Sequence, residues 1–100
     1  PFQLVGTMPS NIEKYAHYYY EFDDTLSNGL TYNADPVVKI NGVEIDIDKV
    51  TVKSTGNSLK VIFNDIKEVA TVTKDSIVTV DYTATLNSNA VIGLDGTQMR

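Results

Sequence analysis

A two-residue Asn-Gly step, Asn41-Gly42, constrains the fold more than any other feature of this sequence. It separates residues 37–40 from residues 43–46, and both segments alternate between apolar and polar side chains. Asn-Gly between such segments is the strongest short-range signal for a β-hairpin, because both residues tolerate the positive φ of a type I′ turn. The sequence therefore predicts two antiparallel strands here.

The rest of the chain has the same β character. Its 100 residues include 12 Val, 8 Ile and 11 Thr, side chains that suit a pleated, half-buried surface. Turn residues recur at intervals of roughly 8–12 residues, the spacing typical of a sandwich or a barrel. Strands are predicted at residues 2–8, 17–24, 37–40, 43–46, 58–63 and 76–86, with alternation continuing through residues 46–52.

Short turns connect the predicted strands. Residues 12–17 are predicted to form a helical turn or a loop. Asn64-Asp65 can cap a single helical turn that runs to Ala70. Asn28-Gly29 is predicted to form a turn with positive φ, and Gly56-Asn57 a second turn.

Composition excludes several classes of function. With 100 residues, 42% of them hydrophobic, the chain fits one folded domain, residues 1–100, and is too apolar to be disordered. The net charge of -5 disfavours nucleic acid and membrane surfaces as partners, since both attract lysine and arginine. The absence of cysteine excludes a disulfide scaffold, a thiolate metal site and a cysteine nucleophile. No cofactor is indicated.

The signatures of common enzymes are missing, including a Gly-rich phosphate loop, HExxH and GxSxG. His17 is the single histidine, and a polar residue at the start of a strand is its simplest interpretation. Asp46 and Asp48 share a predicted strand face, where they can bind calcium or simply face solvent. The run Tyr18 to Tyr20 can stack on a sugar or a base, or it can fill the core.

Asp24 departs from the pattern around it. Alternation places Tyr20, Phe22 and Asp24 on one apolar face and Asp23 on the other. A buried carboxylate costs several kcal/mol unless it is paired, hydrogen-bonded or neutral. Two interpretations stay open. Either the strand ends at Phe22 and Asp24 caps the next turn, or Asp24 stays in the core, protonated, and does acid–base chemistry.

The sequence resembles a known family. Residues 20–32, Tyr-Glu-Phe-Asp-Asp-Thr-Leu-Ser-Asn-Gly-Leu-Thr-Tyr, resemble the aromatic-x-Asp-Thr-Leu-x-x-Gly-Leu-Thr signature of the isopeptide-forming D2-type domain of Gram-positive pilin backbone subunits. Residues 80–87 resemble the penultimate strand of that domain, and residues 89–93 resemble the loop after it. The hairpin of residues 37–43 matches the segment between them. The resemblance covers nearly the whole chain, in order.

This resemblance implies an immunoglobulin-like β-sandwich of the Cna type. It also implies an extracellular place in the shaft of a sortase-assembled, wall-anchored pilus. Such domains join their first and last strands by a Lys–Asn isopeptide bond that an acidic residue assists. Asp24 matches the family aspartate beside Thr-Leu and is the expected acid, whereas Asp23, which alternation turns outward, is the second candidate.

In the family the bonding lysine lies before the position of Phe2, and the bonding asparagine lies after residues 97–99. The resemblance therefore implies that the first and last strands, with both bonding residues, lie outside this sequence. Alternation puts all seven lysines on polar faces or in loops, so none is a good replacement. The bond forms once, so the domain is not a turnover enzyme, although strands supplied in trans would make it a split peptide ligase.

The expected partners are neighbouring pilin domains or subunits and the flanking strands. The alternative function is a ligand-binding adhesin domain that recognises a carbohydrate or a host matrix protein through Tyr19 and residues 87–96. A hydrolase is disfavoured because no acid–base–nucleophile set is apparent.

Overall fold

The Asn41-Gly42 step closes a hairpin between β4 (Val37–Ile40) and β5 (Val43–Ile45), as the sequence predicts. Asn41 and Gly42 have φ values of 54° and 82° in the computed structural model of the chain, which describes residues 1–88. The Asn41 side chain reinforces the turn, because its Oδ1 accepts a hydrogen bond of 2.9 Å from the backbone N–H of Ile77. The hairpin is thereby tied to the neighbouring strand.

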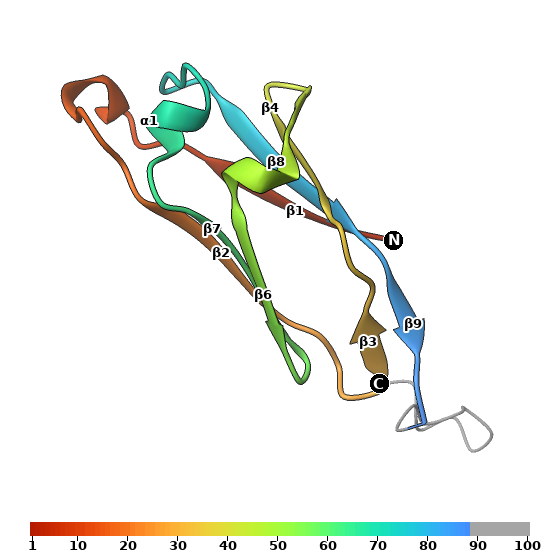
Figure 1. Ribbon diagram of the computed structural model, residues 1–100. Coiled ribbons are helices and arrows are strands. Elements are labelled where there is room, and N and C mark those ends of the chain that lie inside the picture. Colours follow the sequence, from red (N-terminus) through yellow and green to blue (C-terminus); the bar gives the residue numbers. More distant parts are fainter. Residues whose placement is uncertain (89–100) are drawn as a thin grey trace.

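The described strands are antiparallel and form two main layers (Figure 1). One sheet has the order β1-β8-β4-β5, the other has the order β2-β7-β6, and β3 and β9 form a separate pair. The strands not yet bounded are β1 (Phe2–Thr7), β2 (Tyr20–Thr25), β3 (Leu30–Tyr32), β6 (Thr51–Thr55), β7 (Ser58–Phe63), β8 (Ile77–Tyr82) and β9 (Ala84–Leu86). The predicted all-β sandwich is confirmed.

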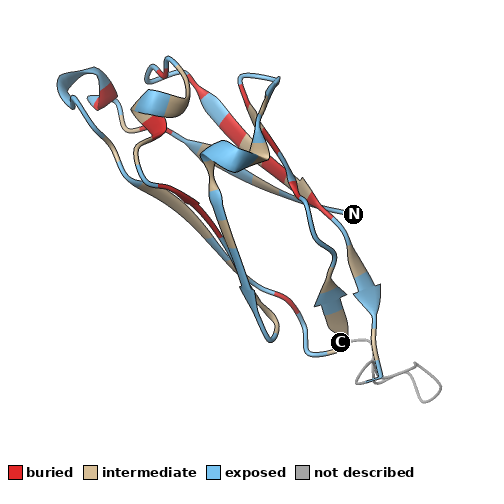
Figure 2. Ribbon diagram, viewed as in Figure 1, coloured by how far each residue is buried: buried red, intermediate tan, exposed pale blue. Residues whose placement is uncertain are grey.

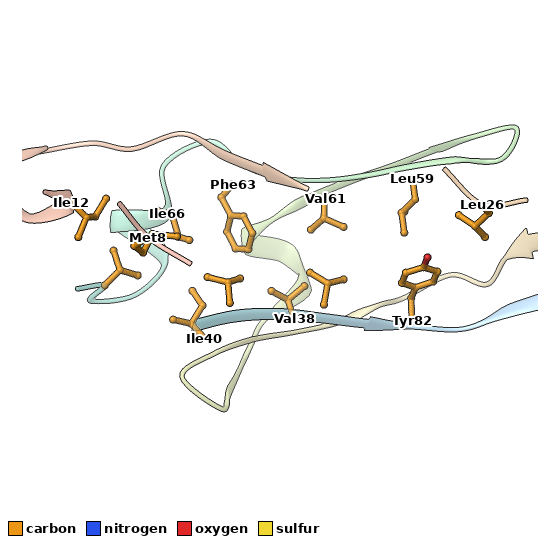
Figure 3. Packing of buried hydrophobic residues seen from close by; sticks show 13 residues of the cluster. Met8, Ile12, Leu26, Val38, Ile40, Leu59, Val61, Phe63, Ile66 and Tyr82 are labelled. Atoms are coloured by element: carbon orange, nitrogen blue, oxygen red, sulfur yellow. The ribbon is translucent and has the colours of Figure 1, made fainter. Parts of the chain in front are cut away.

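The core fills the space between the two layers (Figures 2 and 3). The strands β4 and β8 direct alternate residues inward from one sheet, and β7 does so from the other; these residues are Val38, Ile40, Val78, Val80, Tyr82, Leu59, Val61 and Phe63. Met8, Ile12 and Ile66 close one end of this core, and Leu26 lies at the other end beyond Leu59 (Figure 3).

Three short helical turns join the strands of the described residues: η1 (Ile12–Lys14), η2 (Ile47–Lys49) and α1 (Ile66–Val69). The predicted cap of α1 is confirmed, because Asp65 Oδ1 accepts from the backbone N–H of Lys67 at 3.1 Å. The side chain of Ile66 is fully buried, so the cap orients an anchor in the core. Among the described residues, no helix is long and apolar enough to span a membrane.

The strand predicted for residues 17–24 begins later, at Tyr20, and continues to Thr25. The backbone of Tyr18 is engaged elsewhere: its N–H donates to Asp65 Oδ1 at 3.0 Å, and its carbonyl accepts from the N–H of Ile66 at 2.8 Å. Because these bonds attach Tyr18 to the start of α1, the residues before Tyr20 cannot pair with β7.

The strand predicted for residues 76–86 is interrupted at Thr83, so that prediction is wrong in its continuity. The carbonyl of Thr83 accepts from the N–H of Asn33 at 3.0 Å, and its hydroxyl accepts from the Asn33 side chain at 2.9 Å. The chain thus leaves β1 and β4 after β8 and pairs with β3 as β9. Strict alternation along the predicted strand would put Leu86 on the same face as Val80 and Tyr82, but Leu86 is 65% exposed.

Two turn predictions are also corrected. The alternation predicted for residues 46–52 is broken by η2, because Asp46 Oδ1 accepts from the N–H of Asp48 at 3.0 Å and starts a helical turn. The Asn28-Gly29 turn forms, with a hydrogen bond of 3.0 Å from Leu30 N–H to the Ser27 carbonyl. Its predicted positive φ is wrong, since positive φ in the described chain occurs only at Asp35, Asn41, Gly42 and Gly56.

Gly6 on β1 allows the two layers to approach closely. A methyl group at this position would lie 2.1 Å from the hydroxyl oxygen of Tyr20 and 2.9 Å from Cζ of Phe22. We expect Gly6→Ala to lower the free energy of unfolding by about 1–3 kcal/mol, because both rings must move within a packed core. Urea denaturation measures this loss. The control is Val5→Ala, since Val5 is 59% exposed and its truncation should change stability by no more than about 0.5 kcal/mol.

Candidate functional site

Asp24 extends from β2 toward β8, between the two layers. Its Oδ2 accepts a short hydrogen bond from the hydroxyl of Tyr82, and its Oδ1 accepts from the backbone N–H of Thr25 at 3.0 Å. On the adjacent strand Asp24 pairs with Leu59, which is fully buried. The strand therefore does not end at Phe22, and Asp24 is half-buried on its inner face. The acid–base role of Asp24 stays a prediction.

Tyr82 holds its hydroxyl at the centre of this site. The residue is only 5% exposed, and its ring stacks on Phe2 with a centroid distance of 5.2 Å. Tyr32 packs edge-on against the same ring at 5.8 Å. Burial raises the pKa of Tyr82 to about 12, with the Asp24 hydrogen bond and charge acting in the same direction. Tyr82 is therefore a neutral donor at physiological pH.

Asp23 lies on the opposite face of β2 and is exposed. It pairs with Lys60 across the sheet, and a hydrogen bond with the Glu21 carboxyl raises the pKa of Asp23. Lys60 Nζ in turn lies 3.9 Å from Glu21 Oε2. The structure thus separates the two candidate acids: Asp24 faces the interior, whereas Asp23 belongs to a solvated group of charges.

All seven lysines lie within the described residues, and none is buried. Lys67 is the most engaged, because its Nζ donates to the carbonyls of Ile12 at 3.0 Å and Tyr15 at 2.6 Å. This amine closes the end of η1 and lies in the α1 region, away from Asp24. The prediction that the lysines occupy polar faces and loops is confirmed.

The residues that could bind a metal ion lie apart from Asp24. Asp46 and Asp48 are joined through a backbone hydrogen bond in a helical turn and do not share a strand face. In the described chain, one group could hold a cation: ligand atoms of His17, Asp65 and Glu68 lie within 4.8 Å of one another. Hydrogen bonds already account for this group, since His17 Nδ1 lies 2.5 Å from Asp65 Oδ2. The backbone N–H of Tyr18, followed by the His17 bond, lowers the pKa of Asp65.

The tyrosine run does not form a stacking platform. Tyr18 and Tyr20 are half-buried and pack against the core, whereas Tyr19 is 55% exposed. The Tyr19 hydroxyl donates to Glu21 Oε1 at 2.5 Å. Tyr19 lines a shallow hollow on the outer face of β2-β7-β6, together with Lys53 and Lys60.

The sequence does not reveal Tyr82 as the partner of Asp24. Alternation places each residue on an inner face, but the two are 58 positions apart and belong to different sheets. Period-2 patterning says which way a side chain points and leaves the offset between facing sheets undetermined. The sequence signal that could have suggested the pair is that Asp24 and Tyr82 both point inward on strands of facing sheets.

A family model described as Gram-positive pilin backbone subunit 2, Cna-B-like domain, matches residues 5–97. The match covers the strands β2 to β9, and so it includes Asp24 and Tyr82. Comparison with curated proteins and with solved structures gives no significant match.

Proposed function

This chain belongs to the Cna-B-like domain family of Gram-positive pilin backbone subunits, and on that premise we propose that Asp24 is the acid for an intramolecular Lys–Asn isopeptide bond. Membership of the family gives the coarser function, a structural domain of a pilus shaft on the cell surface, with an immunoglobulin-like β-sandwich fold. In the proposal the pilus is wall-anchored. Neighbouring pilin domains and the flanking strands are the partners, and those strands supply the lysine and the asparagine.

One observation carries the proposal: a carboxylate lies between the two sheets, opposite a fully buried leucine, with a single side-chain partner in the described structure. A carboxylate and an ammonium are both costly in such surroundings. Proton transfer from a lysine to Asp24 removes both charges and leaves a neutral, nucleophilic amine. The exposed Asp23 lacks this property, because water stabilises its charge.

The reaction balances without a cofactor. The lysine ammonium gives one proton to Asp24, and its Nζ then forms a bond to Cγ of the asparagine while the Asp24 carboxyl protonates the carboxamide oxygen. As the tetrahedral intermediate collapses, the bond from Cγ to Nδ2 breaks, and the protons shuttled by Asp24 leave with the nitrogen. One ammonium and one carboxamide become one secondary amide and one ammonium ion, so the chain becomes one ammonia lighter.

The intact mass of the full pilin subunit tests the proposal. We expect the wild-type subunit to be lighter than its coding sequence by one ammonia for this domain, and Asp24→Asn to retain that mass. Asn keeps the shape of Asp and can accept from Tyr82, but it cannot take the lysine proton. Asp23→Asn is the matched control and should lose the ammonia normally. Loss in Asp24→Asn together with retention in Asp23→Asn would assign the acid to Asp23 instead.

A ligand-binding adhesin domain is the second proposal. The exposed Tyr19 ring and the hollow that it lines with Lys53 and Lys60 support it. Residues 87 and 88 are the only part of the predicted ligand loop, residues 87–96, inside the described chain. Binding to immobilised collagen and to a panel of host glycans, measured for the wild type and for Tyr19→Ala, tests this function. A pure shaft domain binds neither.

A further inference from the structure

Within residues 1–88, the bond from Tyr82 is the one side-chain hydrogen bond that Asp24 accepts from the opposite sheet. Asp24 also accepts a hydrogen bond from the backbone N–H of Thr25, the next residue of the same strand. That bond is local to β2 and does not position Asp24 relative to the opposite sheet. Only the hydroxyl of Tyr82, among the described residues, relates Asp24 to β8. The position of the acid relative to the facing sheet therefore depends on this tyrosine.

Two other aromatic rings pack against the ring of Tyr82. Phe2 stacks on it with an interplanar angle of 16°, and Tyr32 meets it at 61°. Figure 3 shows the hydroxyl pointing across the core toward Leu59 and Leu26. Because neither ring nor hydroxyl can turn freely in a packed interior, the direction of the donated hydrogen bond is set by the fold.

We infer that Tyr82 is a positioning residue for the isopeptide reaction: its hydroxyl holds Oδ2 of Asp24 in place so that the carboxyl group meets the incoming lysine and asparagine. The inference rests on the proposed function of Asp24. Effective acid–base catalysis requires the acid within hydrogen-bond reach of the reacting atoms, and small misplacements are costly in rate. A carboxyl group without this bond is free to rotate away from them.

Tyr82 neither gains nor loses a proton in this scheme. Its raised pKa, about 12, keeps the phenol neutral, so the hydroxyl donates to Asp24 before and after the lysine proton arrives. The protons of the reaction pass only among the lysine, Asp24 and the asparagine. Tyr82 thus acts through Asp24, and its removal should slow bond formation without changing the product.

The test follows the loss of ammonia with time in the full pilin subunit after a short pulse of cell-free synthesis, so that the time course starts from chains in which the bond has not yet formed. We expect Tyr82→Phe to form the bond at least about tenfold more slowly than the wild type. Tyr20→Phe is the matched control, because its hydroxyl donates to the carbonyl of Thr7 at 3.1 Å and does not touch Asp24. Rates are compared at equal folded fraction, so that a general loss of stability does not count as slowing.

A spectroscopic measurement separates positioning from a merely structural role. The infrared carboxyl band of Asp24, identified by its loss in Asp24→Asn, should shift in Tyr82→Phe and stay unchanged in Tyr20→Phe. Wild-type rates in Tyr82→Phe, with Asp24→Asn inactive, would overturn this inference and leave the proposed function standing. A wild-type subunit that never loses ammonia would overturn both.

Discussion

Replacing Phe63 by alanine is expected to lower the free energy of unfolding by about 3–5 kcal/mol, the largest effect of any substitution considered for stability. Phe63 is fully buried at the end of β7, and its ring lies 6.2 Å from that of Tyr20 on the neighbouring strand. Truncation removes the transfer free energy of the ring and leaves a cavity between two sheets that cannot fully collapse. Urea denaturation of the wild type and the variant measures the difference.

Leu86→Ala is the control that makes the Phe63 result specific. Simple alternation directs both side chains inward, whereas the structure buries Phe63 and leaves Leu86 65% exposed. The leucine substitution should therefore cost no more than about 0.5 kcal/mol. A cost comparable with that of Phe63→Ala would mean that β9 packs into the core. If Phe63→Ala is too unstable to purify, Phe63→Leu, with an expected loss of about 1–2 kcal/mol, gives the same ranking.

The features that the sequence predicts are those with local causes. The β4–β5 hairpin depends on two adjacent residues with positive φ, and α1 depends on an aspartate that caps the next turn. The inward direction of Asp24 likewise follows from the period of its own strand. Each of these features depends on only a few neighbouring residues, so it can be predicted without knowing how distant parts of the chain pack.

Apart from the local errors at residues 46–52 and at Asn28-Gly29, the failures involve a partner that is distant in sequence. Asp65 takes the backbone of Tyr18 away from β2, and Asn33 interrupts the long strand at Thr83. The Tyr82–Asp24 bond joins residues of different sheets. These pairings depend on how the layers are offset, which no short pattern contains. The sequence therefore identifies Asp24 as a candidate residue, but it does not predict that Tyr82 is its hydrogen-bond partner.

Stability is expected to fall in alkali because of Tyr82, and this is the second large effect. The folded state raises the pKa of Tyr82 from 10.0 to about 12, so it binds the phenolic proton more tightly than the unfolded chain does. The contribution is fully present below pH 10 and is lost as the pH rises toward about 12. Since one pKa unit corresponds to about 1.36 kcal/mol, up to about 2.7 kcal/mol is at stake.

The difference between the wild type and Tyr82→Phe isolates this contribution. Burial raises the pKa of Tyr20 and of Tyr32 in both proteins, so the contributions of these two tyrosines cancel in the difference. Urea denaturation across the window should show the wild type falling more steeply than the variant. A second variant, Asp24→Asn, removes the neighbouring charge and should lower the pKa of Tyr82 below about 12 in a phenolate absorbance titration. Parallel stability curves, with an unchanged titration in Asp24→Asn, would mean that Tyr82 and Asp24 do not share the buried hydrogen bond on which the site is built.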